Sequence, residues 1–128
     1  MNHLLEKIHS ARSDIFVNEP FLGFILQHIP IELNDKTLSA YTDGRSIVIG
    51  ESFLAPLTVN DTAFLLLHEL LHIILGHMYR RERRSLMRFN VACDIVVNEI
   101  IRHYGLSPDK LNPIYGSMYD IQPYNKTA

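Results

Sequence analysis

The sequence has 128 residues, of which 47% are hydrophobic and 20% are charged. This is the length and composition of one globular domain with a hydrophobic core, and we predict a single domain over residues 1–128. The net charge of −2 gives no reason to expect nucleic acid or an anionic membrane as a partner.

Two further features indicate where the protein works. The apolar stretch around His68 is too short, and too polar at its centre, to span a bilayer. The N-terminal residues lack a signal-peptide pattern, and the single cysteine, Cys93, excludes an internal disulfide. We predict a cytoplasmic protein with no membrane partner.

The first thirty residues predict two helices. Apolar residues recur at helical spacing from Leu4 to Ile15, so residues 3–16 should form an amphipathic helix. Pro20 suits the first turn of a second helix, which Pro30 should end. The buried face of this second helix is expected to consist of Phe21, Phe24 and Ile25.

Residues 37–49 predict a β-hairpin. They read T-L-S-A-Y-T-D-G-R-S-I-V-I, and Asp43-Gly44 between two β-prone runs is typical of a tight turn. One interpretation is a ribbon that only covers the core. In the other, one edge of the ribbon lines a cleft and pairs with an extended peptide. The hairpin residues alone favour the first interpretation, and only the motif downstream supports the second.

The central helix should begin at Val59 and reach about His77, because Thr58 to Asp61 fits a capping box. Residues 64–76 within it read F-L-L-L-H-E-L-L-H-I-I-L-G. An apolar run of this kind predicts a helix that is buried on nearly all sides.

His68, Glu69 and His72 interrupt this apolar run. Burying a carboxylate and two imidazoles is costly unless something pairs with them. H-E-x-x-H on a helix is the usual arrangement for binding zinc, because residues four apart lie one above the other. Glu69 lies about 100° round the helix from His68, where a general base acting on water should lie. We predict His68 and His72 as zinc ligands and Glu69 as the catalytic base.

The third ligand is predicted on the next helix, residues 88–104. Catalytic zinc takes three protein ligands and leaves the fourth position to water. Asp94 is favoured because it is an acid in the middle of an apolar helix that can return antiparallel to the first. Glu99 and His103 are the alternatives, but Glu99 lies about 140° from Asp94, so the two cannot both face the metal.

Neighbouring polar residues have open roles. Asn90 and Asn98 each lie one turn from Asp94, and either could orient an imidazole ligand by accepting its N–H. Capping or bridging of helices is an equal alternative. His77 lies about 140° from His72 and is excluded as a ligand. Gly76 should let another element approach the metal side closely.

The remaining segments predict surface structure. Residues 79–88 contain five arginines, which is typical of a solvated helix end or loop. Residues 106–128 contain three prolines and little periodicity, so we expect loops. One phenol of this tail could lie near a developing oxyanion. The candidates are Tyr115, Tyr119 and Tyr124. The chain ends without a closing element, as the N-terminal part of a longer protein would.

Three stretches resemble the metallopeptidase domain of bacterial and phage proteins, and the similarity covers most of the chain. They read Y-T-D-G-R-S-I-V-I (41–49), H-E-L-L-H-I-I-L-G-H (68–77) and F-N-V-A-C-D-I-V-V-N (89–98). The resemblance implies His68, His72 and Asp94 as metal ligands and Glu69 as the acid/base. In that group the domain commonly precedes a von Willebrand factor A-like (VWA-like) domain, so the resemblance also implies such a partner.

The two-helix plan is more distantly similar to thermolysin-like enzymes, whose third ligand is a glutamate from the following helix. The aspartate side chain of Asp94 is shorter than that of glutamate, so the two helices must pack closer together. The small residues Gly76 and Ala92 would permit this.

Together these features predict an α+β fold: a mostly helical, zincin-like domain with a β-hairpin or small antiparallel sheet beside the metal-binding helix. The predicted function is zinc-dependent hydrolysis of peptide bonds in a protein or peptide substrate. Two alternatives stay open. One is a catalytically silent zinc-binding adaptor that works with a partner protein, and the other is a helical domain without metal.

Overall fold

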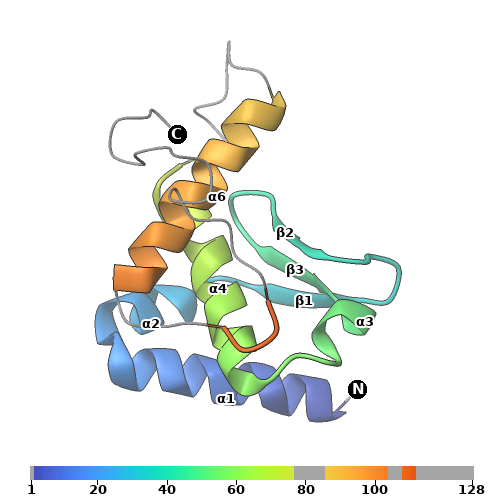
Figure 1. The fold of residues 1–128 in the computed structure, drawn as a ribbon. Coiled ribbons are helices and arrows are strands. Elements are labelled where there is room, and N and C mark those ends of the chain that lie inside the picture. Colours follow the sequence, from blue (N-terminus) through green and yellow to red (C-terminus); the bar gives the residue numbers. More distant parts are fainter. Residues whose placement is uncertain (1, 77–85, 104–107, 112–128) are drawn as a thin grey trace.

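The computed structural model describes residues 2–76, 86–103 and 108–111 (Figure 1). Within the helix that begins at residue 86, side chains are described from Cys93 onward. The described residues form five helices and one three-stranded sheet, which confirms the predicted α+β class.

Helix α1 (Asn2–Asn18) underlies the core. Its buried residues, Leu4, Ile8, Ala11 and Ile15, follow helical spacing and agree with the helix predicted over residues 3–16. The helix packs against both α2 and α4.

Helix α2 (Pro20–Leu26) begins with proline, as predicted, and Ile25 packs against the core, but the prediction that Phe21 and Phe24 are buried was wrong. Phe21 and Phe24 are 75% and 57% exposed, whereas Leu22, Gly23 and Leu26 are buried. The reason is the contact with α1. A Cβ atom at Gly23 would lie 2.5 Å from the Cα of Phe16, so only glycine lets the two helices approach this closely. This contact turns the two phenylalanines outward.

The sheet has the order β1-β3-β2. Strands β2 (Ala40–Thr42) and β3 (Ile47–Gly50) pair antiparallel, which confirms the hairpin, and Gly44 in its turn has φ 95°. Strand β1 (Ile31–Asn34), which was not predicted from the sequence, pairs parallel to β3. Four residues between Pro30 and a polar loop carry too little alternation to indicate a strand. β3 is the central strand, and all four of its residues are buried.

After the short helix α3 (Glu51–Leu54), helix α4 (Val59–Ile74) crosses the middle of the molecule. The predicted capping box is confirmed, because Thr58 Oγ1 accepts from the amide of Asp61 while the Asp61 carboxylate accepts from the amide of Thr58. The helix ends earlier than predicted, since Gly76 has φ +66°. A Cβ there would meet no described atom within 4 Å, so the described residues show no close approach of another element at Gly76.

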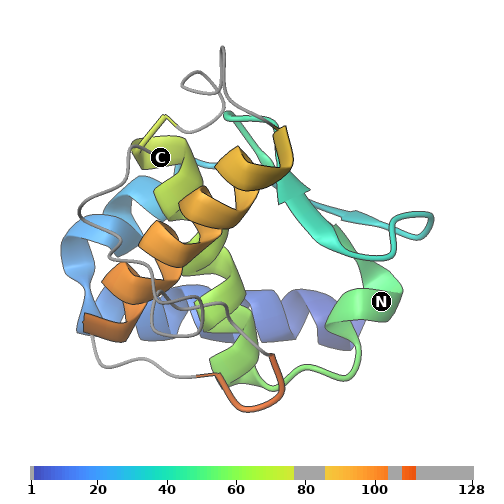
Figure 2. The ribbon, with the colours of Figure 1, turned by 45° about the horizontal axis from the view of Figure 1, so that its top comes forward.

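Helix α6 (Leu86–His103) returns antiparallel alongside α4, while the sheet lies on the other side of α4 (Figures 1 and 2). The two helices pack in direct contact. The described helices include none with the length and hydropathy needed to cross a membrane. This arrangement places the middle of α6 against the H-E-x-x-H segment of α4.

Candidate metal centre

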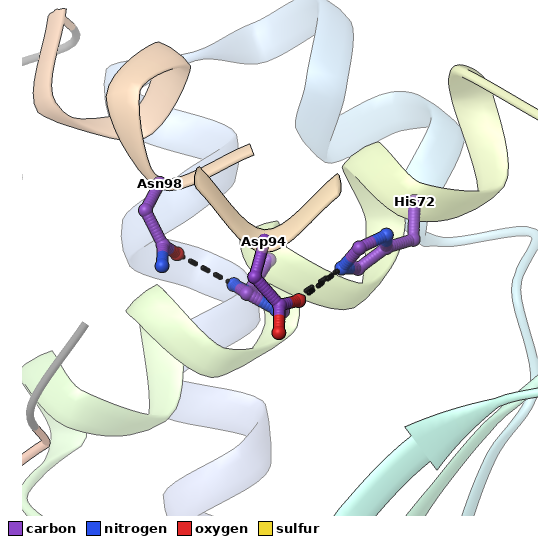
Figure 3. A network of polar contacts seen from close by, with 4 residues as sticks. His72, Asp94 and Asn98 are labelled. Atoms are coloured by element: carbon purple, nitrogen blue, oxygen red, sulfur yellow. Dashed lines mark hydrogen bonds and ion pairs between the residues drawn. The ribbon is translucent and has the colours of Figure 1, made fainter. Parts of the chain in front are cut away.

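Three side chains from the two antiparallel helices converge on one point. Nε2 of His68 and Nε2 of His72 lie 3.1 Å apart, and Asp94 Oδ1 lies 3.2 Å from the first and 3.0 Å from the second. Asp94 reaches down from α6 toward His72 on α4 (Figure 3). Each residue offers one ligand atom, and these atoms all lie within 4.8 Å of one another, so the group could hold a metal ion. Helical spacing explains the histidine pair, and the packing of α4 on α6 supplies the carboxylate.

Asn98 holds the ring of His68 from behind. Its Oδ1 lies 2.7 Å from Nδ1 of His68, and Asn98 is only 2% exposed. With this oxygen as the acceptor, Nδ1 carries the proton and the neutral ring keeps a lone pair on Nε2. That lone pair faces the carboxylate oxygen of Asp94, which is itself an acceptor. These two acceptor atoms, Nε2 of His68 and Oδ1 of Asp94, are stable at this distance only with a cation or a proton between them.

The electrostatics of the group agree with this geometry. Burial pushes the pKa of Asp94 upward, but the imidazole rings of His68 and His72, whose Nε2 atoms lie 3.2 Å and 3.0 Å from its Oδ1, outweigh burial and hold the pKa well below its usual range. Burial lowers the pKa of His68, but the hydrogen bond to Asp94 and the charges of Glu69 and Asp94 raise it on balance. The site therefore favours positive charge at the point where the three side chains meet.

Glu69 lies beside the group and not in it. Glu69 is 7% exposed, and its carboxylate makes no hydrogen bond within the described part of the chain. Burial is the main reason that its pKa is raised, and the charge of Asp94 adds to this, although His68 and His72 act in the opposite direction. Glu69 is a carboxyl group whose affinity for a proton is increased next to a candidate metal site.

A cleft of about 240 Å³ lies between the sheet and α4. Ser39 and Ala40, at the start of β2, line one side, and His68 and Glu69 of α4 line the other. The start of β2 therefore lines a cleft, as the second interpretation of the hairpin requires, while the pairing of its edge with a peptide stays a prediction. Asp94 and Asn98 also line the cleft, so His68 and Asp94 of the metal group are both accessible from it.

The alternative third ligands are not brought to this point. Glu99 forms an ion pair with Arg102 on its own helix, and His103 is exposed at the helix end. Among the described residues, only His68, His72 and Asp94 form a group suited to a metal. Several residues with predicted roles fall outside the described residues or side chains: His77, residues 79–88, Asn90, Ala92, Tyr115, Tyr119 and Tyr124.

One contact that shapes the cleft was not predicted from the sequence. The buried carboxylate of Asp61 accepts backbone N–H bonds from Asp109 at 2.6 Å, Lys110 at 2.8 Å and Leu111 at 3.5 Å. Thr58 Oγ1 donates to the Asp109 carboxylate at 2.7 Å. These bonds bring Leu111 to the wall of the cleft. The capping box already accounted for Asp61, so its second role left no separate signal in the sequence.

A family model described as "Putative metallopeptidase domain" matches residues 5–115. The matched range contains α4, α6 and the sheet, and so the whole candidate centre. Comparison with curated proteins and with solved structures finds no match.

Proposed function

The chain belongs to this metallopeptidase domain family, and from that premise we propose that it is a zinc-dependent peptidase. In this proposal His68, His72 and Asp94 hold the zinc ion, and Glu69 is the general base. The observation that carries it is the convergence of three ligand atoms within 4.8 Å beside a buried carboxylate that lines a cleft.

The donor set supports zinc over other cations. Two imidazole nitrogens and one carboxylate oxygen are ligands that zinc accepts, whereas magnesium and calcium prefer oxygen alone. Three protein ligands leave a further position, as catalytic zinc sites do. Asn98 supports the same assignment, because its bond to Nδ1 of His68 leaves Nε2 deprotonated and oriented toward the other two ligands.

Glu69 is suited to proton transfer. Zinc in such a site supplies Lewis-acid chemistry, lowering the pKa of water and polarising a carbonyl oxygen. The Glu69 carboxylate takes a proton from the attacking water and delivers it to the leaving nitrogen. Its raised pKa helps it to hold the proton between these two transfers. The apolar surroundings of α4 limit exchange of that proton with solvent.

The outer edge of β2 offers a place for an extended substrate. The amide of Gly50 donates to the carbonyl of Ser39, and Ala40 is paired with Ile49. In an antiparallel ladder the backbone groups of alternate residues point to opposite edges, so those of Ala40 point away from β3. A peptide that adds as a further strand there would pass the cleft containing Glu69. We therefore propose that the substrate is an unfolded or extended segment of protein.

Four predictions from the sequence remain part of the proposal. They are the single-domain organisation of residues 1–128, their place in a longer protein, the cytoplasmic location and the VWA-like partner.

The decisive experiment replaces Glu69 by Gln in the full 128-residue chain loaded with zinc. Glu69→Gln should lower the rate of peptide hydrolysis by a factor of about 100 or more, because it removes the proton acceptor. It should keep one zinc per chain in elemental analysis. The matched control is Glu32→Gln, at an exposed position on β1, which should keep both activity and zinc.

Three outcomes separate the proposal from its alternatives. Full activity in Glu69→Gln would contradict the role of the base. Stoichiometric zinc with no hydrolysis of any peptide by the wild-type chain would favour the adaptor. A chain purified from zinc-containing medium that holds no metal would leave only the metal-free helical domain.

A further inference from the structure

One side of the cleft that Glu69 lines is apolar, and the walls of this apolar pocket come from separate parts of the chain. Phe64 and Leu65 are contributed by α4, Phe53 by α3, and Leu111 by the segment 108–111. Ala40 closes the side toward the sheet. The whole cleft, including its polar side, has a volume of about 240 Å³, which is smaller than the roughly 300–1,000 Å³ of sites for drug-sized ligands. That size suits one large apolar side chain.

The wall at Leu111 is held in place before any ligand binds. Two short bonds, from the amides of Asp109 and Lys110, join its segment to the Asp61 carboxylate at the start of α4. The Lys110 ammonium group donates to the carbonyl of Pro56 at 2.9 Å, which ties the same segment to the loop before α4. A wall that is already ordered costs little conformational entropy on binding, so the pocket can select a side chain by shape.

We propose that this pocket is the specificity site of the enzyme and receives a large apolar side chain, leucine or phenylalanine, from a substrate residue next to the scissile bond. The inference rests on the proposed function, because the pocket opens beside Glu69 and His68. An acidic side chain is disfavoured, since it would lose its hydration among apolar walls and approach the carboxylates of Glu69 and Asp94.

The test uses amino-acid hydroxamates, which bind zinc through one common group and differ only in the side chain that probes the pocket. Dissociation constants of the glycine, leucine, phenylalanine and aspartate hydroxamates are measured by calorimetry on the zinc-loaded chain. Burying a leucine or phenylalanine side chain should tighten binding about ten- to a hundredfold relative to glycine. The aspartate compound should bind no better than the glycine compound.

Two variants alter the pocket in opposite ways. Leu111→Ala removes a wall and should reduce the advantage of leucine over glycine at least about threefold. Ala40→Leu fills the pocket and should weaken binding of the leucine and phenylalanine compounds while leaving that of glycine unchanged. Leu38→Ala is the control, because Leu38 is 84% exposed and does not line the cleft. If one pocket variant does not fold, the other still tests the proposal.

Different experimental results would overturn the pocket and the proposed function. Equal affinities for all four hydroxamates in a chain with one zinc would overturn the pocket and leave the metal centre intact. The pocket would also be overturned if the leucine hydroxamate still bound more tightly than the glycine hydroxamate, by the wild-type factor, in both pocket variants. A chain that holds no zinc and binds no hydroxamate would overturn both proposals.

Discussion

Replacing Asp61 by Ala should be among the most damaging single changes to this fold, although Asp61 lies outside the metal group. The residue is fully buried, and its carboxylate accepts amide bonds from Thr58, Asp109 and Lys110 at 2.6–3.2 Å, with a longer one from Leu111. A hydrogen bond to a charged group contributes about 1.5–3 kcal/mol. Asp109 and Lys110 are exposed, so water can satisfy their amides once the segment detaches. That limits the loss to about 2–4 kcal/mol, and Asp61→Asn, which keeps one oxygen acceptor, should lose about half.

The loss should depend on pH in a defined direction. Burial raises the pKa of Asp61, but the amide bonds outweigh it and hold the pKa below its ordinary value of 3.8. A carboxyl group with a lowered pKa in the folded state stabilises that state fully above the pKa of the unfolded chain. This contribution is lost as the pH falls from about 4 through the lowered value. The difference between wild type and Asp61→Asn should therefore shrink between pH 5 and pH 2.

Urea unfolding followed by circular dichroism measures both effects. Asp43→Asn is the matched control, because the Asp43 carboxylate also accepts two backbone amides but lies in the exposed hairpin turn. It should change the free energy of unfolding far less. The reasoning would be refuted if Asp61→Ala were within about 0.5 kcal/mol of wild type, or if the difference did not vary with pH.

Three further results are expected. Leu66 is fully buried, so Leu66→Ala should lower the free energy of unfolding by about 2–5 kcal/mol. Leu38 is exposed, so Leu38→Ala should change it by less than about 0.5 kcal/mol. Similar losses in both variants would contradict the observed core. Asn98→Ala should weaken zinc binding about 10- to 100-fold in competition with a chromogenic chelator, because His68 loses the group that orients it. An unchanged zinc affinity would mean that this bond does not position the ring. Chelation with EDTA should lower Tm, and zinc but not magnesium should restore it; a Tm indifferent to chelation would be evidence against a metal in the folded chain.

The local parts of the site follow from sequence spacing alone. The four-residue interval between His68 and His72 fixes their common face in any helix, and the 100° step to Glu69 places that carboxylate beside them. The capping box at Thr58 and the turn at Asp43-Gly44 are also set by neighbouring residues, and both are present in the structure. Asp94 could be predicted as a partner because an acid in the middle of an apolar helix needs a cation or donors, and two helices in sequence readily pack antiparallel.

Tertiary packing alone determined the remaining features. Periodicity cannot tell which side of a two-turn helix is buried, and the contact of Gly23 with Phe16 turned Phe21 and Phe24 to the surface. The partner strand β1 and the wall at Leu111 also depend on contacts between distant parts of the chain, since Asp61 and Lys110 are forty-nine residues apart. Such contacts leave no local pattern, because the free energy that forms them arises only when the core is assembled. The sequence alone thus determines which groups could hold a metal and move a proton. The fold decides which side chains surround these groups in the cleft.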